Sequence, residues 1–495
     1  MTPGFTTGVS SLALILLPVS GNNVPVVSDS IASVSPFAII PFVLLLVSMA
    51  ALPFINREWW EKRYPFISFG LAVVTLLYYW IGVGAVGKIG HVLEEYVSFI
   101  VLIGSLFIVA GGIVIRLKGK ASPIANTITL LIGALVSNII GTTGASMIMI
   151  RPYLHVNKSR MRPYHIVFFI FIVSNIGGAL TPIGDPPLFL GYLMGVPFFW
   201  IFLNVWQIWI LALGVLLILF FVVDTIQFKK ALKENTVHPA EEFHEEAQVK
   251  GLQNIFFLFV ILIAVFIQEP KYIRELLMLI AAGGSYFLTK KEIHQQNNFS
   301  FIPLKEVAIL FLCIFITMVP ALDWIEVHAV SIGLSLPGHY YWATGGLSSV
   351  LDNAPTYVNF LHAAIGLKVS PDAIAHLQAF IAARGNDITG LAPDLQRTMD
   401  VLRTYHLTIV NAGLVPVDDI KISYLIANAD SYLKAISIGA VFFGALTYIG
   451  NGSNMLVKSI AEHHHAKCPS FHEYVLKYSL PILIPIFLIV WWVFF

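Results

Sequence analysis

A seven-residue phrase occurs twice in this chain, each time inside a long apolar stretch. Residues 178–184 read Gly-Ala-Leu-Thr-Pro-Ile-Gly, and residues 444–450 read Gly-Ala-Leu-Thr-Tyr-Ile-Gly. The first copy continues into Asp185-Pro186-Pro187, and the second continues into Asn451-Gly452-Ser453-Asn454. Glycine, proline and polar residues at corresponding places of two apolar segments indicate two interrupted membrane helices that are related by an internal repeat.

The composition requires a membrane around these segments. Hydrophobic residues make up 57% of the 495, charged residues only 12%, and the mean hydropathy is +0.81. A soluble domain of this length would need a polar surface that this chain lacks, so the sequence predicts an all-α polytopic membrane protein. The net charge of +1 gives no indication of a nucleic-acid partner, and two cysteines do not make a disulfide framework.

Apolar segments of spanning or near-spanning length recur along the whole chain, and about 20 residues are needed for one helix to cross. They lie at residues 36–55, 65–83, 97–115, 123–150, 163–195, 197–223, 252–268, 276–289, 303–320, 340–365, 433–460 and 478–495. A shorter apolar stretch at residues 9–19 reads either as a membrane-associated lead-in or as a weak signal sequence, and its removal is left open.

Basic residues set the predicted orientation, since cytoplasmic loops carry an excess of Lys and Arg. The segment at 123–150 is the informative one, because basic clusters stand on both sides of it: Arg116, Lys118 and Lys120 before, and Arg151, Lys158, Arg160 and Arg162 after. A segment that enters and turns back keeps both clusters in the cytoplasm. We therefore predict a re-entrant hairpin, for which irregular backbone must be enclosed by protein or line a water-filled cavity.

The same alternation predicts a second hairpin at 340–365 that enters from outside. Its centre aligns with that of the first hairpin, Ser137 with Ser348, Gly141 with Asp352, and Thr142 with Asn353. We thus predict an inverted repeat: residues 65–223 with hairpin 123–150 and broken helix 163–195, and residues 276–495 with hairpin 340–365, external insertion 366–432 and broken helix 433–460. Residues 1–64 form a lead-in and peripheral span, and residues 224–275 a cytoplasmic loop and linking span. In the insertion, residues 372–383 read as a short helix and the rest as turns.

Asp185 and Asp352 are the acidic residues predicted to lie deepest in the membrane, and both fall at helix breaks. An ionised aspartate at the bilayer centre costs roughly 2.5–3.5 kcal/mol on insertion scales, so it needs a partner, a cavity or a proton. Low dielectric favours the protonated form of a carboxyl and a bound cation favours the ionised form, which allows Na⁺ and H⁺ to compete for one group. A structural alternative for Asp185 is the N-cap of a helix that begins at Pro186.

Other candidate ligands are oxygen-bearing residues at the same breaks, because hard cations prefer oxygen. In the first half they are Ser137, Asn138, Thr142, Thr143, Asn175, Thr181 and Gly184, and in the second half Ser348, Ser349, Asn353, Thr356, Thr447, Asn451 and Asn454. Together they predict Na⁺ sites near Asp185 and Asp352. Three other features are interpreted as structural, with no role in ion binding. The tract His463-His464-His465 is an interfacial cap, the acidic run at residues 241–246 is a solvated helix face, and Arg151 is an interfacial residue.

These motifs resemble those of the ion transporter superfamily, which includes citrate carriers, arsenite pumps and NhaD-type sodium/proton antiporters. The resemblance rests on Ser174-Asn175 through Asp185-Pro186-Pro187, on Gly141-Thr142-Thr143-Gly144, on Leu351-Asp352-Asn353-Ala354-Pro355 and on Tyr448-Ile449-Gly450-Asn451-Gly452. It is strongest for the putative citrate transport or sodium:proton antiporter branch. It implies a scaffold domain and a transport domain with two hairpins, often in a homodimer, and elevator-like alternating access. The family's Ser-Asn-Thr hairpin signature is only partly present, since Ile139 follows Asn138.

The sequence therefore predicts a secondary active ion transporter, not an enzyme, in the plasma (inner) membrane. We expect sodium/proton antiport by alternating access, with Na⁺ and H⁺ as transported ions, no cofactor and no catalytic residue. A Na⁺- or H⁺-coupled carrier of citrate or another organic anion is the alternative. A remote alternative is an intramembrane aspartyl protease using Asp185 and Asp352, against which the Pro-Pro after Asp185 and the repeat both argue. The expected partners are the lipid bilayer and one small ion or organic anion.

Overall fold

The computed structural model describes residues 34–116, 122–233, 248–267, 270, 272–297, 299–385 and 387–495. The predicted lead-in at residues 9–19, the basic residues Lys118 and Lys120, and the acidic run at 241–246 lie outside these ranges.

Helices dominate the described residues, and eight helical segments there are long and apolar enough to cross a membrane. The predicted class, an all-α polytopic membrane protein, is confirmed. The eight segments are Pro36–Pro53, Lys62–Val83, Gly87–Gly111, Pro123–Val156, Phe198–Lys233, Ile302–Ile332, Val417–Leu446 and Phe471–Phe494.

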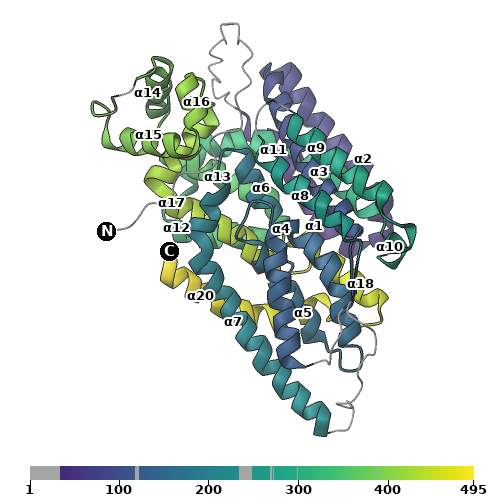
Figure 1. The fold of residues 1–495 in the computed structure, drawn as a ribbon. Coiled ribbons are helices and arrows are strands. Elements are labelled where there is room, and N and C mark those ends of the chain that lie inside the picture. The colour runs from purple at the N-terminus through teal and green to yellow at the C-terminus, as the bar shows by residue number, and fades with distance from the viewer. Residues whose placement is uncertain are drawn as a thin grey trace. The chain divides into compact units, whose positions relative to one another are not determined.

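The first half of the chain contains α1 (Ile40–Ile55), α2 (Arg57–Leu77), α3 (Val86–Gly111), α4 (Pro123–Val156), α5 (Pro163–Ile172), α6 (Pro186–Leu193) and α7 (Phe198–Lys233) (Figure 1). A short antiparallel pair, β1 (Val114–Arg116) and β2 (Gln248–Lys250), joins the end of α3 to the segment before α8. Helix α3 begins at Val86, 11 residues before the predicted apolar segment at 97–115.

The second half begins with α8 (Gln253–Val265), α9 (Ile273–Leu288), α10 (Lys291–Gln296) and α11 (Ile302–His328). It continues with α12 (Pro337–Ser348), α13 (Asn353–Lys368), α14 (Pro371–Ala382), α15 (Pro393–Tyr405), α16 (Leu407–Ala412), α17 (Val417–Phe443), α18 (Gly452–His463), α19 (Phe471–Glu473) and α20 (Leu480–Phe494). The predicted helix at 372–383 corresponds to α14, whereas α15, α16 and the start of α17 replace the turns expected in the rest of the insertion. The helices α14, α15 and α16 lie together at one end of Figure 1.

Helix α4 folds back on itself at Gly141. This glycine has φ 77° and ψ 156°, a conformation that an L side chain strains to adopt. Asn126 and Asn157 stand at the two ends of α4, 31 residues apart, yet their amides exchange hydrogen bonds of 2.8 and 2.9 Å. A straight helix would separate them by roughly 1.5 Å per residue. The 34-residue segment is therefore a hairpin of two helices, and the side from which it enters a membrane stays a prediction.

Three further breaks interrupt the remaining helical segments at the predicted places. Residues 173–185 separate α5 from α6, residues 349–352 separate α12 from α13, and residues 444–451 separate α17 from α18. At two of them a side chain caps the helix that follows: Asp352 accepts from the Ala354 amide at 3.1 Å, and Asn451 accepts from the Ser453 amide at 3.1 Å. Each break thus ends in a defined new helix start.

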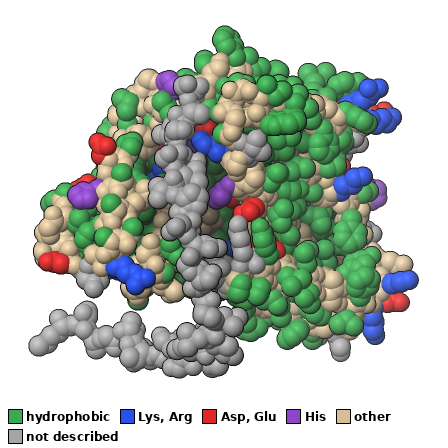
Figure 2. Space-filling view, turned by 90° about the horizontal axis from the view of Figure 1, so that it is seen from above, with side chains coloured by type: hydrophobic (Ala, Val, Ile, Leu, Met, Phe, Trp, Pro, Cys, Tyr) green, Lys and Arg blue, Asp and Glu red, His purple; other side chains and the backbone are tan. Residues whose placement is uncertain are grey.

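Helices α3 and α11 pack side by side in opposite directions. Phe99 stacks on Phe311 near the middle, with 4.9 Å between ring centroids, and Phe107 near the end of α3 meets Phe299 just before α11 at 5.5 Å. Hydrophobic side chains cover the surface around α2 and α9 (Figure 2), where Phe66, Trp80 and Phe287 are among the exposed residues. Such a surface is suited to lipid rather than to water.

Candidate functional site

Both copies of the repeated phrase bring their two terminal glycines into close backbone contact. A methyl group at Gly184 would lie 2.0 Å from the Gly178 carbonyl oxygen, and one at Gly450 would lie 2.7 Å from that of Gly444. No larger residue fits at either position without moving backbone. The glycines are repeated because each half needs the same tight loop between the two parts of its broken helix.

The threonine in the middle of the phrase ties each loop to the hairpin of its own half. Thr181 Oγ1 donates to the Asn138 carbonyl at 2.6 Å, and Thr447 Oγ1 donates to the Ser349 carbonyl at 2.6 Å. Each hydroxyl also accepts from the last glycine of the phrase, at 3.1 Å from Gly184 N and 3.2 Å from Gly450 N. The two halves therefore share these hydrogen bonds as well as the phrase.

Predicted ligands near the hairpin tips donate to backbone carbonyls of the broken helix in the same half. Ser137 Oγ donates to the Val173 carbonyl at 2.7 Å, and Ser348 Oγ donates to the Ala440 carbonyl at 2.6 Å. Asn138 donates to the Gly177 carbonyl at 2.6 Å and accepts from the Leu180 amide at 2.9 Å. These contacts hold each hairpin against its broken helix.

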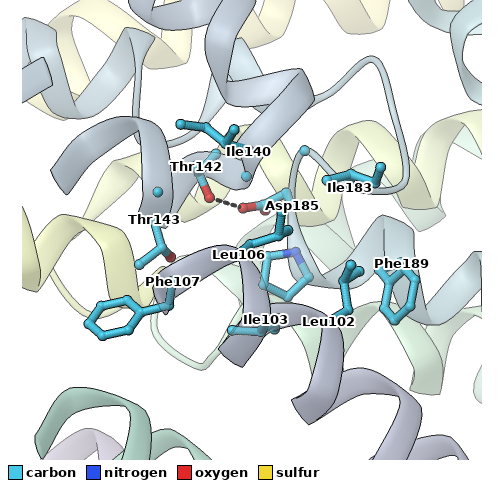
Figure 3. A pocket seen from close by; sticks show the side chains of 14 residues that line it. Leu102, Ile103, Leu106, Phe107, Ile140, Thr142, Thr143, Ile183, Asp185 and Phe189 are labelled. Carbon is cyan, nitrogen blue, oxygen red and sulfur yellow. Dashed lines mark hydrogen bonds between the residues drawn. The ribbon is translucent and has the colours of Figure 1, made fainter. Parts of the chain in front are cut away.

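Asp185 is fully buried and accepts three side-chain hydrogen bonds. Thr142 Oγ1 lies 2.7 Å and Asn451 Nδ2 3.0 Å from Oδ1, while Asn353 Nδ2 lies 2.5 Å from Oδ2. Figure 3 shows the contact with Thr142 at the tip of the first hairpin. Asp185 occupies the predicted N-cap position of α6, where its carbonyl accepts from the Leu188 amide at 3.1 Å, but its carboxylate makes no capping bond. It joins both hairpins and the second broken helix instead.

A second set of contacts joins the two broken helices directly. Asn175 Nδ2 donates to Asn454 Oδ1 at 2.7 Å, and Asn454 Nδ2 donates to the Gly444 and Thr447 carbonyls. Ser453 Oγ donates to the Ser174 carbonyl at 2.8 Å, and Ser174 Oγ lies 2.8 Å from Ser146 Oγ. Sequence reasoning missed these three serines, although Ser174 and Ser453 stand directly beside asparagines that it selected.

Asp352 has a different environment from Asp185. It is partly exposed, caps α13, and its carbonyl accepts from Thr356 Oγ1 at 2.9 Å. Ser349, three residues earlier, is also partly exposed and donates to the Gly346 carbonyl at 2.7 Å. Asp352 lines an open cavity of about 490 Å³ between α1, α2, α11, α18 and the tip of the second hairpin, whereas Asp185 borders a pocket of about 40 Å³.

The cavity beside Asp352 has an acidic lining. Its described lining residues include three carboxylates, those of Asp352, Glu306 and Glu462, and one ammonium group, that of Lys458, which pairs with Glu462 at 2.8 Å. Asn451 also lines it, so the cavity reaches the second broken helix. A cavity with this charge balance attracts cations and repels anions.

A smaller pocket of about 40 Å³ lies at the tip of the first hairpin (Figure 3). Thr143 and Pro186 line it opposite Leu106 and Phe107 in the second half of α3. Thr142 and Asp185 also line it, and its other side chains are mostly apolar. Thr143 thus lies beside the site, while the donors to Asp185 are Thr142, Asn353 and Asn451. Both hairpin tips thus face the same end of the antiparallel α3–α11 pair, the end where Phe107 meets Phe299.

Metal ligation in the described ranges would depend on oxygen rather than on imidazole or thiolate. No group of three or more His, Cys, Asp or Glu side chains there is arranged to hold a metal ion. His463, His464 and His465 are exposed at the end of α18. The oxygen atoms available for a hard cation are those of Asp352, the carbonyls of the broken segments and the hydroxyls beside them.

Comparison with known sequences identifies the relatives of this chain. The sequence model of a family described as "Putative citrate transport" matches residues 31–495, nearly the whole chain. The chain belongs to this family. No curated protein matches its sequence.

Membership agrees with the resemblance seen in the motifs and supports a secondary transporter of ions or organic anions. The apolar helices and the family together make the chain an integral, multi-pass membrane protein. The family description names citrate transport and does not mention sodium/proton exchange.

Proposed function

We propose that this family member is a sodium/proton antiporter that works by alternating access. The main support is the cavity that reaches Asp352, because three carboxylates and one ammonium group are among the described residues that line it. The negative charge of this lining attracts a cation that enters the cavity and repels a tricarboxylate.

Asp352 is the group at which we expect Na⁺ and H⁺ to exclude each other. It borders the cavity, so an ion can reach its carboxylate without opening the buried contacts of Asp185. Backbone carbonyls of the segment between α12 and α13 and the side chain of Asn451 can supply further oxygen ligands. Binding of Na⁺ requires the ionised carboxylate, and protonation removes it, which couples the two ions at one site.

In this proposal Asp185 stabilises the contact between the two hairpins and is not the residue that exchanges the ions. Its two oxygens accept from Thr142, Asn451 and Asn353, so it is satisfied by neutral protein donors. It keeps the tips of both hairpins together while the ion binds at the partly exposed carboxylate of Asp352. Asp352 thus binds the ion, and Asp185 maintains the structure of the site.

The position of the hairpin tips supports an inward-open state. Arg116 follows α3, and Lys290 and Lys291 precede α11, so the predicted cytoplasmic end of this pair is the one that both tips face. In an inverted repeat, exchanging the contacts of the two halves generates the opposite state. The tips would then face the first half of α3 and the second half of α11.

Coupled transport of citrate or another organic anion is the second candidate, and the family description favours it. Lys458 is the cavity residue with which a carboxylate substrate could pair once Glu462 releases it. This requires an anion to displace an existing ion pair in an acidic cavity, which makes cation exchange the better-supported function.

One experiment separates the two candidates. Purified protein is reconstituted into liposomes with a preset ΔpH and a pH-sensitive dye, and Na⁺, Li⁺, K⁺ or citrate is added in turn. We expect Na⁺ to dissipate the gradient saturably and citrate to have no effect. Saturable uptake of labelled citrate without Na⁺-dependent dissipation would reverse the assignment.

A further inference from the structure

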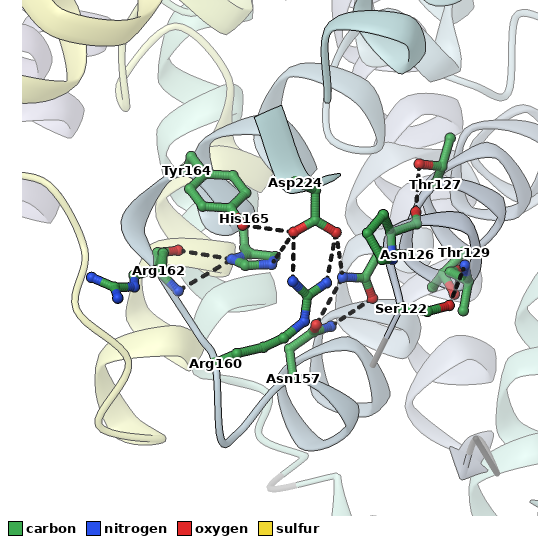
Figure 4. A network of polar contacts seen from close by, with 12 residues as sticks. Ser122, Asn126, Thr127, Thr129, Asn157, Arg160, Arg162, Tyr164, His165 and Asp224 are labelled. Carbon is green, nitrogen blue, oxygen red and sulfur yellow. Dashed lines mark hydrogen bonds and ion pairs between the residues drawn. The ribbon is translucent and has the colours of Figure 1, made fainter. Parts of the chain in front are cut away.

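A second buried carboxylate, Asp224 of α7, accepts more hydrogen bonds than Asp185. Arg160 donates to both of its oxygens, at 2.8 and 2.6 Å, and Tyr164 Oη and Asn126 Nδ2 donate at 2.6 and 3.0 Å (Figure 4). His165 Nε2 lies 3.3 Å away. Asp224 is completely buried and Arg160 nearly so.

These donors come from three separate pieces of the first half. Asn126 belongs to the first helix of the α4 hairpin, Arg160 to the turn after its second helix, and Tyr164 and His165 to the first turn of α5. Asn126 is in turn paired with Asn157 at the foot of the second hairpin helix. Asp224 therefore joins one end of each of three helices, the two of the α4 hairpin and α5; we call these ends the feet. The opposite ends of the same helices lead to Gly141, Thr142 and Asn175.

The ion pair between Asp224 and Arg160 can fix the position of the distant tip of the first hairpin. A bidentate Arg–carboxylate pair sets both the separation and the relative orientation of its two partners. Arg160 is further held by the ring of Phe228, one turn beyond Asp224, at 4.9 Å from the ring centroid. Helices transmit this constraint, because a tilt at the foot of a hairpin displaces its tip.

The second hairpin is held by a different carboxylate, Glu326 of α11, which lies 3.1 Å from His362 Nδ1 in α13 and accepts from Lys421 Nζ in α17 at 2.6 Å. The foot of α12 meets α20 through Gly338 and Trp491, and at the end of α13 the ammonium of Lys368 lies 4.7 Å from the ring centroid of Tyr432. No acidic residue occurs in α20. The two hairpins are thus anchored by different residues, and Asp224 contacts none of those that hold the second, which makes the second an internal control for the first.

We propose that Asp224 is a positioning residue for the ion site. It acts through the feet of the first hairpin and α5, and so keeps Thr142 against Asp185. This inference concerns how the site is held and uses the proposed function only for its transport readout.

Hydrogen exchange followed by mass spectrometry tests the inference on the full-length protein in nanodiscs. In Asp224→Asn, the amides of residues 137–146 should exchange about tenfold faster, as expected for loss of a charge-assisted buried hydrogen bond. Peptides covering residues 348–356 of the second hairpin should be unchanged. Tyr164→Phe removes one donor and leaves the ion pair, so it should accelerate the same peptides by roughly threefold.

Asp323→Asn is the matched control. Asp323 of α11 also bonds a cation and a tyrosine, Lys88 at 3.0 Å and Tyr79 at 2.6 Å, but it contacts neither foot of the first hairpin. Its loss should leave residues 137–146 unchanged. Unchanged exchange at 137–146 in both Asp224→Asn and Tyr164→Phe, or an equal rise at 348–356, would overturn the positioning role.

Transport gives a second readout. The Na⁺ concentration for half-maximal ΔpH dissipation should rise about tenfold in Asp224→Asn, and Asp224→Glu should recover most of the affinity. A wild-type protein without Na⁺/H⁺ exchange would refute the proposed function, and the exchange measurement would still decide whether Asp224 positions the hairpin.

Discussion

Asn353 Nδ2 lies 2.5 Å from Asp185 Oδ2, although the two residues are 168 positions apart in the chain. The bond joins the start of α13 in the second half to the break before α6 in the first half. Thr142 and Asn451 complete the set of donors. One carboxylate therefore connects both hairpins with both broken helices, and a change at any donor should be felt across the repeat.

Replacing Asp352 by Asn should abolish Na⁺-dependent ΔpH dissipation in proteoliposomes. The amide keeps the size of the side chain and its cap on α13, but it cannot exchange a proton for a cation. Glu306→Gln, in the same cavity, should retain exchange with a weaker apparent Na⁺ affinity, since it removes attraction but not the exchanging group. Full activity of Asp352→Asn would contradict the role assigned to this residue.

Removing the amide of Asn353 should destabilise the protein more than removing a comparable amide nearby. Asn353→Ala leaves a buried carboxylate short of one donor, at a cost of about 1.5–3 kcal/mol. Asn359→Ala, on the same helix, loses a bond to the Pro355 carbonyl and should cost about 1 kcal/mol. Unfolding in detergent, compared between the two variants, measures the difference. Equal losses would argue against Asp185 as the joint between the halves.

Alanine at Gly184 or Gly450 should prevent the tight loop from forming. The added methyl would lie 2.0 Å from a backbone oxygen at Gly184 and 2.7 Å from one at Gly450, and backbone cannot rotate away as a side chain can. We expect the free energy of unfolding to fall by about 3 kcal/mol, the upper end of the usual cost of overpacking. Gly214→Ala in α7 has no atom within 4 Å and should be close to neutral. Normal yield and thermal stability of Gly184→Ala would show that the close approach is dispensable.

The cavity beside Asp352 should be reached from the cytoplasmic face. In a background with Cys313 and Cys468 replaced by Ser, a cysteine at Met455, which is exposed and lines the cavity, should react with a membrane-impermeant thiol reagent in inside-out vesicles only. A cysteine at the exposed His376 in α14 should react in right-side-out vesicles. The reverse pattern would invert the predicted orientation and the inward-open interpretation.

Local sequence patterns were sufficient for the class of the protein and the places where its helices break. Hydropathy reports the cost of exposing backbone and side chains to lipid, which is paid residue by residue, so the membrane helices can be read from composition along the chain. The repeated phrase likewise marks two tight loops, because its glycines and threonine make contacts within one broken helix and its own hairpin.

Helix ends were less well predicted. Helix α3 begins before the expected boundary, and α15 and α16 form where we expected turns. The cluster of Leu395, Met399 and Leu402 buried against Ile420 explains the second difference, because packing of this apolar face outweighs the polar, proline-containing local sequence.

The unequal environments of Asp185 and Asp352 are a property of the folded molecule alone. In the chain they look alike, each an acid at a helix break, and yet one is enclosed by three donors while the other borders an open cavity. The cluster around Asp224 could not be predicted from the chain either, since its hydrogen-bond donors Tyr164, Arg160 and Asn126 lie 60 to 98 residues away. Burial and hydrogen-bond partners depend on which distant segments meet, and neither periodicity nor charge bias records that information.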